Sequence, residues 1–235
     1  MRVSLVIPAY NEEKRLEPFL ASILRYYPHH QSDIHEIIVV DDGSTDQTSA
    51  VANTFNHRLP IRVLRLEPNQ GKGAAVAAGV QASHGEAIVF MDADGATDIS
   101  ELPKIIAALG TNDVAVGNRW MKGAHTERRS LLRRFAGWVY RLYLAPFHLS
   151  GIDTMCGCKG YRREIAHALF GSLQEKRWLF DSEVAYKAIL RGYRIANVPI
   201  RWEAKDGSKL SLKTFIGSAF HVWPLLLRIR SAERS

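Results

Sequence analysis

The stretch that decides the fold is AIVFMDAD, residues 87–94. Its first five residues are apolar, and an apolar run of this length is typical of a buried strand. Side chains two positions apart on a strand point the same way, so the carboxylates of Asp92 and Asp94 converge where the strand ends. Two close carboxylates repel each other, and a bound hard cation relieves the repulsion. The stretch therefore predicts a strand that ends at a metal site, with solvated turn aspartates as the alternative.

The sequence on both sides of this stretch alternates between strand-like and helix-like segments. Strands are expected at residues 2–8, 36–40, 61–66 and 113–116, and helices at residues 11–27, 74–82 and 99–109. Asn11 is the expected N-cap of the first helix, because a short polar side chain can accept from the free N–H groups of a first turn. Such alternation predicts an α/β fold with a mostly parallel, Rossmann-like sheet and helices on both faces.

Charge is divided unevenly along the chain, whose net charge is +7. Residues 1–118 carry nine Lys or Arg and fifteen Asp or Glu, whereas residues 119–235 carry 22 and nine. The acidic first half suits a cation, and the basic second half suits an anionic partner such as nucleic acid or a membrane surface. Cys156 and Cys158 are too few for a disulfide scaffold, and we expect them to be reduced thiols.

Two segments of the basic half, residues 130–149 and 210–229, mix apolar and basic side chains. Arg141 and Pro146 interrupt the first segment, whereas a membrane-spanning helix needs about 20 mainly apolar residues. We therefore expect no transmembrane helix, but basic amphipathic helices at a membrane interface. A core helix with one solvated basic face is the alternative for the first segment. The first residues lack the apolar segment and cleavage site of a signal peptide.

Polar groups also follow two other expected strands, at the edge where open α/β sheets bind ligands. In VIPAYNE, residues 6–12, Tyr10 can stack on a base and Glu12 can accept from a base or ribose. In VVDDGSTD, residues 39–46, a carboxylate can accept from a ring N–H. In NQGKG, residues 69–73, Lys72 can reach a diphosphate, although the P-loop pattern is absent. A strand end, a helix cap and a glycine-rich turn are the alternatives.

Together these motifs resemble the nucleotide-sugar domain of family 2 glycosyltransferases, which have the GT-A fold. Five further motifs resemble the dolichyl-phosphate or polyprenyl-phosphate β-glucosyltransferase branch. These are DADGAT (92–97), GNR (117–119), DTMCGCK (153–159), RWLFDSE (177–183) and GSKL (207–210). The related dolichyl-phosphate mannose synthases usually carry leucine and glutamine where this chain has Gly95 and Ala96. The resemblance covers residues 3 to about 215.

The resemblance implies an inverting transfer of a hexose to a polyprenyl monophosphate at the cytoplasmic face of a membrane. Glucose from UDP-glucose is the expected donor, and GDP-mannose or another saccharide or lipid acceptor are the alternatives. The implied cofactor is Mg²⁺ or Mn²⁺ on Asp92 and Asp94. Because Ala96 replaces the glutamine that mannose synthases offer the metal, Thr97 or water is expected to complete the cation's ligands.

The resemblance also assigns site residues by position. The expected catalytic residues are Asp92, Asp94, Arg119 and Asp181. The expected nucleotide-sugar site adds Pro8, Ala9, Tyr10, Glu12, Val40, Asp42, Lys72, Ala93 and Lys205. The expected acceptor-phosphate site is Arg119, Ser208 and Lys209. Asp153 is a second candidate for positioning the acceptor or the sugar, and a structural hydrogen-bond acceptor is the alternative for both Asp153 and Asp181.

The expected organisation is one GT-A domain over residues 1–215, followed by a basic amphipathic helix over residues 216–235. Within the domain, residues 1–118 form the nucleotide-sugar and metal half, and residues 119–215 form the acceptor half. The expected partners are a nucleotide sugar, a polyprenyl phosphate and an anionic membrane surface, and an integral membrane partner protein is left open. We expect no nucleic-acid partner, because neither a helix-turn-helix nor an RNP-like signature is present.

Overall fold

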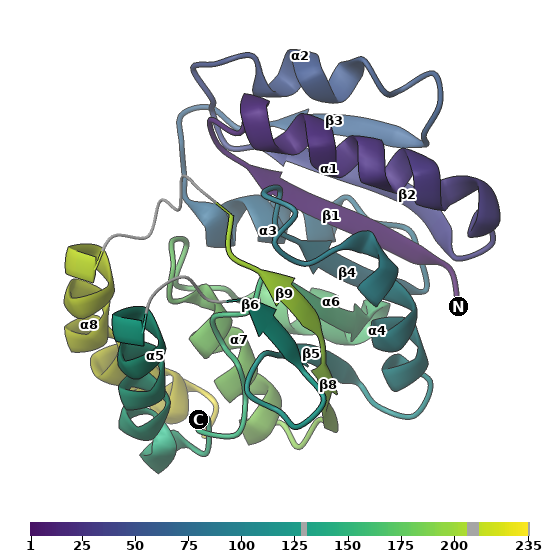
Figure 1. The fold of residues 1–235 in the computed structure, drawn as a ribbon. Coiled ribbons are helices and arrows are strands. Elements are labelled where there is room, and N and C mark those ends of the chain that lie inside the picture. The colour runs from purple at the N-terminus through teal and green to yellow at the C-terminus, as the bar shows by residue number, and fades with distance from the viewer. Residues whose placement is uncertain (128–130, 206–211, 235) are drawn as a thin grey trace.

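A computed structural model of the chain describes residues 1–127, 131–205 and 212–234, with the backbone alone for residues 131–134 and 212–219. A seven-stranded sheet in the order β3-β2-β1-β4-β7-β5-β8 runs through the molecule (Figure 1). Its strands are β1 Val3–Ala9, β2 Ile34–Asp41, β3 Ile61–Arg65, β4 Ala87–Met91, β5 Val114–Asn118, β7 Cys158–Arg162 and β8 Ile195–Pro199. The predicted α/β fold with a mostly parallel sheet is confirmed.

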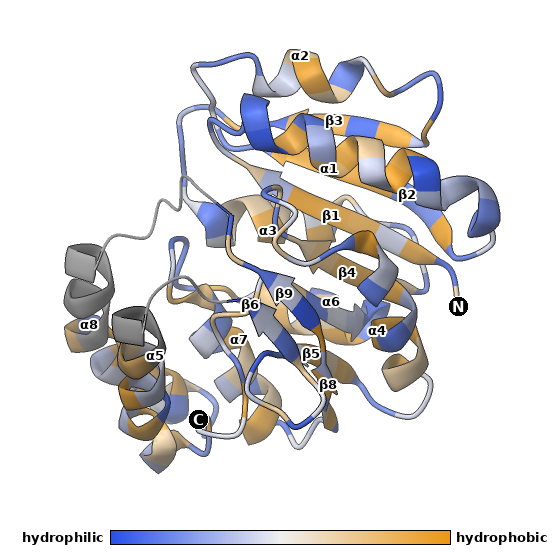
Figure 2. Ribbon diagram, viewed as in Figure 1, coloured by the Kyte–Doolittle hydropathy of each residue, from blue (hydrophilic) through white to orange (hydrophobic). Residues whose placement is uncertain are grey.

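The centre of the sheet is built from strands that are apolar on both faces. Every residue of β1 and β4 is buried, as is normal for parallel strands that helices cover on both sides. Val6 of β1 pairs with Ile38 of β2 on one side and with Phe90 of β4 on the other. Figure 2 shows the resulting hydrophobic band along β1 and β2. Strand β4 therefore holds the Asp92–Asp94 segment at the middle of the sheet.

Strand β7 is antiparallel to both of its neighbours, β4 and β5. Lys159 of β7 pairs with Phe90 on one side and with Val116 on the other. The basic second half of the chain thus contributes β7 and β8 to the same sheet as the acidic first half. The change of net charge at residue 118 is therefore not a boundary between two folding units.

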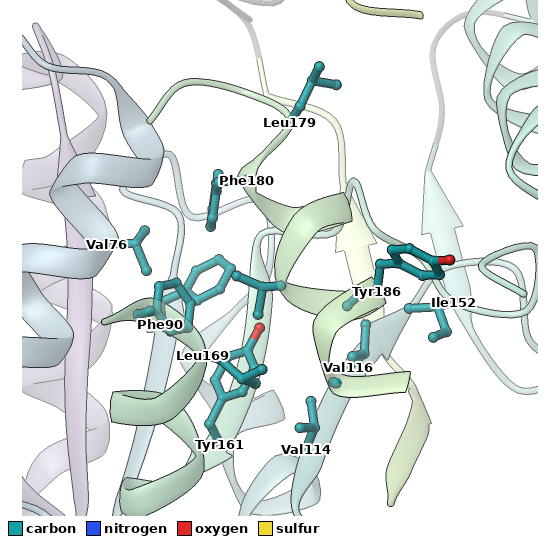
Figure 3. Packing of buried hydrophobic residues seen from close by; sticks show 14 of the residues in the cluster. Val76, Phe90, Val114, Val116, Ile152, Tyr161, Leu169, Leu179, Phe180 and Tyr186 are labelled. Carbon is teal, nitrogen blue, oxygen red and sulfur yellow. The ribbon is translucent and has the colours of Figure 1, made fainter. Parts of the chain in front are cut away.

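Helices cover the two faces of the sheet. One face carries α1 Glu13–Tyr26, α2 Thr48–Asn53 and α4 Leu102–Leu109. The other face carries α3 Lys72–Gln81, α6 Arg163–Phe170, α7 Phe180–Leu190 and α8 Leu212–Ala232. On that second face, Phe90 of β4 lies beside Phe180 of α7, with ring centroids 5.9 Å apart (Figure 3). This contact anchors the first turn of α7 against the strand that carries Asp92.

The predicted N-cap of the first helix is wrong. The N-cap residue of α1 is Glu12, and its side chain forms no capping hydrogen bond. Asn11 has a φ of 49°, in the left-handed region that asparagine tolerates, and its Oδ1 accepts from the backbone N–H of Thr45 at 2.8 Å. The side chain therefore ties the loop after β1 to the loop after β2, a long-range contact that a local pattern does not contain.

Strands β6 His125–Glu127 and β9 Arg201–Glu203 and helix α5 Leu131–Tyr143 lie on the side of the sheet where β5 and β8 are found (Figure 1). The short helices are η1 Tyr27–His29, η2 Ile99–Glu101 and η3 Ala145–Phe147. Strands β6 and β9 pair in a separate two-stranded sheet. The backbone N–H of Glu203 donates to the carbonyl of Ala96 at 2.8 Å, so β9 supports the turn after Asp94.

The second half of α8 packs on the core through Val222, Leu225, Leu226 and Ile229, which share one helix face. The expected division between residues 215 and 216 falls inside α8, and the division into domains stays a prediction. Within the part of the chain that is described, the helices are too short or too polar to cross a bilayer. Cys156 and Cys158 are both buried free thiols.

Candidate active site at the carboxyl edge of the sheet

Strands β1, β2 and β4 are parallel, so their carboxyl ends meet at one edge of the sheet. Tyr10 follows β1, Asp42 follows β2 and Asp92 follows β4, which brings the three predicted motifs together. The apolar residues assigned to the nucleotide-sugar site, Pro8, Ala9, Val40 and Ala93, are buried. Tyr10 is 38% exposed, and its predicted stacking on a base stays a prediction. The edge thus has an apolar floor and a polar rim.

The Asp92–Asp94 segment is a tight turn that the protein holds at several points. The backbone N–H of Asp92 donates to the carbonyl of Gly157 at 2.9 Å, and the N–H of Ala96 donates to Asp94 Oδ1 at 3.0 Å. Gly95 has a φ of +65°. A Cβ on Gly157 would lie 1.9 Å from Asp92 Oδ2, so only glycine leaves room for this carboxylate. The glycine at position 157 therefore provides the space that the Asp92 carboxylate occupies.

The chemistry of this carboxylate pair fits a divalent cation. Asp92 Oδ1 is buried and has no donor aligned for a hydrogen bond, although Lys72 Nζ lies 2.6 Å away. Burial and the neighbouring charge of Asp92 raise the pKa of Asp94, and a hard cation with oxygen ligands relieves such like-charge repulsion. Among the described residues no group of three or more His, Cys, Asp or Glu gathers. A cation here would therefore take further ligands from other groups, and the expected contribution of Thr97 or water stays a prediction.

Lys72 begins α3, and its ammonium reaches the Asp92 carboxylate. Burial opposes its charge, but Asp92 and Asp181 outweigh burial and raise the pKa of Lys72. The lysine is therefore charged throughout the physiological range, as a diphosphate-binding role requires.

The glycines around Lys72 serve a contact within the protein. The N–H groups of Gly73 and Ala74 donate to the carbonyls of Arg177 and Lys176 at 3.2 and 3.0 Å. A Cβ on Gly71 would lie 2.5 Å from the carbonyl oxygen of Lys176. Because the segment before α7 occupies the N-terminus of α3, the backbone N–H groups of Gly73 and Ala74 already have partners within the protein. The ammonium of Lys72 remains the candidate contact.

Asp42 holds the loop that leads to Lys72. Its carboxylate accepts from the side chain of Asn69 and from the backbone N–H groups of Gln70 and Gly71, each at 2.8 Å. Oδ2 accepts two of these hydrogen bonds and Oδ1 accepts one, so Oδ1 keeps a lone pair for a further donor. The predicted contact of Asp42 with a ring N–H stays a prediction.

Glu12 lies beside the same edge but is bound to Arg15. Arg15 Nε donates to Glu12 Oε2 at 2.6 Å, and Arg15 Nη1 lies 4.0 Å from Asp94 Oδ2. Arg15 therefore links the loop after β1 to the metal-binding candidate, and sequence reasoning missed it. The predicted contact of Glu12 with a base or ribose stays a prediction.

A buried ion pair lies behind the Asp92 carboxylate. Lys159 of β7 donates to Asp181 Oδ1 of α7 at 2.7 Å and to the carbonyl of Thr154 at 3.2 Å. Burial raises the pKa of Asp181, although Lys159 and Lys72 oppose this change. Sequence reasoning missed Lys159, because its strand CKGYR contains two charged residues and a glycine and lacks the apolar pattern of a buried strand.

Arg119 is held by Asp153 in a two-point ion pair. Arg119 Nε and Nη2 donate to the two oxygens of Asp153 at 2.7 and 2.9 Å. Burial disfavours the charged form of both groups, but the attraction between the two charges is stronger. The pKa of Asp153 is therefore lowered and that of Arg119 is raised. The guanidinium also lies 5.1 Å from the ring of Trp202 on β9. Asp153 therefore fixes the orientation of Arg119, whose charge acts on Asp92.

The structure does not join every predicted residue to this cluster. Lys205 is bound to Glu203, with Nζ 2.7 Å from Oε2. Ser208 and Lys209 lie outside the described residues. The predicted acceptor-phosphate site therefore contains one described member, Arg119.

Known proteins resemble the chain over nearly its whole length. Residues 4–170 match the model of glycosyl transferase family 2. A dolichyl-phosphate beta-glucosyltransferase of Trichomonas vaginalis is 37% identical over 97% of this chain and 72% of that relative. The human dolichyl-phosphate beta-glucosyltransferase is 38% identical over 89% of this chain and 69% of that relative.

Solved structures share the fold. Glucosyl-3-phosphoglycerate synthase from Mycobacterium tuberculosis, crystallised with Mn²⁺, UDP and phosphoglyceric acid, superposes with a TM-score of 0.75 at 22% identity. The match covers 97% of this chain and 78% of that one. At this identity the likeness concerns the fold alone, and it agrees with the GT-A architecture described above. The chain therefore belongs to glycosyl transferase family 2.

Proposed function

We propose that this glycosyltransferase transfers glucose from UDP-glucose to a polyprenyl monophosphate of the dolichyl type, with inversion at the sugar. The observation that carries the proposal is the carboxylate pair Asp92–Asp94 at the sheet edge, surrounded by Lys72, Lys159 and Arg119. Relatives that are 37 and 38% identical, of which the chain covers 72 and 69%, are named dolichyl-phosphate beta-glucosyltransferases. A structural neighbour was crystallised with UDP and Mn²⁺. The relatives' names support glucose as the sugar and dolichyl phosphate as the acceptor, and the neighbour's ligand supports UDP as the nucleotide of the proposed donor.

The donor side of the reaction uses the acidic edge. Asp92 and Asp94 would hold Mg²⁺ or Mn²⁺, which, when bound, offsets the negative charge that develops on a departing nucleoside diphosphate. Tyr10 would stack on the base, and Asp42 would accept from a ring N–H. Lys72 would neutralise the diphosphate, because its ammonium already lies at the edge where the carboxylates meet.

The acceptor side uses orientation and charge more than proton transfer. A phosphate monoester is already anionic near neutral pH, so it needs positioning and charge screening rather than a strong base. Arg119, fixed by Asp153, would orient this phosphate, together with Lys205, Ser208 and Lys209. Asp181, held by Lys159, would position the sugar or the acceptor.

A lipid-bound acceptor requires the enzyme to work at a bilayer surface. Phe135, Trp138, Val139 and Leu142 are exposed on one face of α5, with spacings of three and four residues. We call this set the α5 apolar face. Such a face beside basic residues is typical of helices that lie in a membrane interface. We place the protein on the cytoplasmic leaflet, whose anionic lipids attract basic segments, and an integral membrane partner would be compatible with this placement.

A radiolabel assay tests the proposal directly. Purified protein with Mg²⁺ is offered UDP-glucose or GDP-mannose, each labelled in the sugar, with dolichyl phosphate in detergent. We expect label from UDP-glucose in an organic-soluble, acid-labile product, and loss of that product in Asp92→Asn. Label from GDP-mannose alone would contradict the donor, and label only in water-soluble products would contradict the acceptor.

A further inference from the structure

The two lysines nearest the Asp92 carboxylate differ in how firmly they are held. Lys159 has a side chain that is 1% exposed, and its three N–H groups reach Asp181 and the carbonyls of Thr154 and Cys156. Lys72 has a side chain that is 20% exposed, and its ammonium faces Asp92, which is itself 31% exposed. Lys159 is therefore a fixed counter-ion, whereas Lys72 can leave its partner without breaking a network.

The surroundings of Lys72 allow its ammonium to move while its backbone stays in place. The backbone is fixed at the start of α3, because the adjacent Gly73 is packed against the segment before α7. The ammonium lies 6.0 Å from the ring centroid of Phe90 and 5.9 Å from that of Trp178. Aromatic faces attract a cation without fixing it by directional hydrogen bonds. The ammonium of Lys72 is therefore attracted by these two rings as well as by Asp92.

Several acidic side chains lie near the ammonium of Lys72. Asp92, Asp94 and Asp181 place three carboxylates within electrostatic range of Lys72. Lys72 Nζ lies 2.6 Å from Asp92 Oδ1, a buried oxygen that has no aligned hydrogen-bond donor, and so occupies a position that a cation bound to this oxygen would need. A divalent cation on Asp92 and the ammonium of Lys72 would repel each other at this distance. The two cannot both be Asp92's close partner.

We propose that Lys72 is the exchangeable counter-ion of Asp92. It neutralises Asp92 in the free enzyme, and its ammonium passes to the donor's diphosphate when the nucleotide sugar binds. This inference rests on the proposed function, because it assumes a metal-binding pair and a diphosphate ligand. Lys72 thereby makes binding of the divalent cation unfavourable in the absence of the nucleotide and favourable in its presence. Such coupling is reciprocal between the two ligands.

Mn²⁺ binding to nucleotide-free protein tests the inference. Lys72→Met removes the competing charge, so we expect Mn²⁺ to bind at least about tenfold more tightly, since a charge this close shifts such equilibria by one to three powers of ten. Free Mn²⁺ is measured by electron paramagnetic resonance. Lys72→Gln is the second variant, and Lys72→Arg is expected to bind Mn²⁺ as weakly as the parent. Lys104→Met is the matched control, because this substitution removes the same charge from α4, where Lys104 pairs with Glu101 at the end of η2.

The nucleotide supplies the second half of the test. UDP should tighten Mn²⁺ binding in the parent, and this gain should be several-fold smaller in Lys72→Met, whose affinity for UDP without metal should also fall. Equal or weaker Mn²⁺ binding in both Lys72→Met and Lys72→Gln, with melting temperatures like the parent's, would overturn the inference. Parent-like Mn²⁺ binding by Asp92→Asn would overturn it as well.

The two proposals can fail separately. The Mn²⁺ titration requires no acceptor and no transfer. If the Lys72 variants bind Mn²⁺ more tightly but the parent makes no lipid-linked glucose, the proposed function fails and the counter-ion role stands. If the parent makes that product but the variants bind Mn²⁺ as the parent does, the counter-ion role fails and the proposed function stands.

Discussion

Gly157 is the residue on which the position of the Asp92 carboxylate depends most directly. A Cβ at this position would lie 1.9 Å from Asp92 Oδ2 and 2.1 Å from its carboxyl carbon. Gly157→Ala must therefore rotate the carboxylate or move the strand, and a displacement of about 1 Å at reacting groups can cost about a hundredfold in rate.

We expect Gly157→Ala to lower kcat/KM for glucosyl transfer at least about a hundredfold, because a displaced Asp92 no longer meets the donor correctly. The measurement is steady-state transfer to dolichyl phosphate. Gly151→Ala is the matched control, since a Cβ at Gly151 has no neighbour within 4 Å. Parent-like activity in Gly157→Ala would show that the position of Asp92 does not depend on the absence of a side chain at residue 157.

At the residue scale, the sequence predicted the positions of the acidic groups better than their partners. The spacing of Asp92 and Asp94 after an apolar run was sufficient to place both at the end of a strand. The approach of Arg15 to Asp94 and the pairing of Lys159 with Asp181 were missed because these residues are distant along the chain, and periodicity contains no information on such pairs. Asn11 was assigned to a helix cap for the same reason, since its actual partner is the backbone of Thr45.

At the scale of elements, an ion pair joins the ends of α7 and α8. Arg191, which follows α7, donates to Glu233 after α8 through Nε at 2.8 Å, and its Nη1 donates to the carbonyl of Ala168 on α6 at 2.9 Å. The hydrogen bond from Arg191 lowers the pKa of Glu233 below its ordinary value. We call this contact the α7–α8 clasp. It fixes the C-terminal end of the chain to the face of the sheet that carries Asp181.

We expect Glu233→Gln to lower the free energy of unfolding by no more than about 1 kcal/mol at pH 7, which is the usual range for partly exposed pairs. The pKa of Glu233 is lower in the folded protein than in the unfolded chain, where it is about 4.3. The clasp therefore contributes its full stabilisation at pH values above the unfolded pKa, and this stabilisation is lost as the pH falls through the folded pKa. The difference between parent and variant should therefore vanish in acid. Urea unfolding across pH 3 to 7 measures it, with Glu17→Gln as the control for charge alone.

Most elements of the first half were predictable, because strands that are apolar on both faces and amphipathic helices have distinct patterns. Strand β7 was not expected. Its sequence, CKGYR, contains two charged residues and a glycine, which conceals its buried position. Lys159 is tolerated there because Asp181 and two carbonyls satisfy it, and the tertiary fold alone provides those partners.

For the whole molecule, α5 and α8 lie on the same side, remote from α1 and α2 (Figure 1). Trp223 of α8 donates through Nε1 to the carbonyl of Tyr143 at 3.2 Å, which joins the two helices. One face of α8 packs on the core. The expected contact of α5 and α8 with a membrane interface stays a prediction.

We expect Phe135→Ser combined with Leu142→Ser to weaken binding to anionic vesicles about tenfold or more, because each side chain gives up about 1 kcal/mol or more of apolar burial. Both residues are more than half exposed, so the melting temperature should stay within a few degrees of the parent's. Vesicle sedimentation measures the change, with phosphatidylcholine vesicles as the uncharged control. Equal sedimentation of variant and parent would exclude the α5 apolar face as a membrane contact.

The central position of β7 has a consequence for the order in which the chain can fold during synthesis. Strands β4 and β5 are complete by residue 118, yet they become neighbours only through β7, which begins at residue 158. Until the ribosome has released those later residues, both strands keep an unpaired edge, and unpaired edges invite aggregation. The nascent chain therefore exposes these edges while about forty more residues are made, and β5 keeps its other edge unpaired until β8, at residues 195–199, has followed.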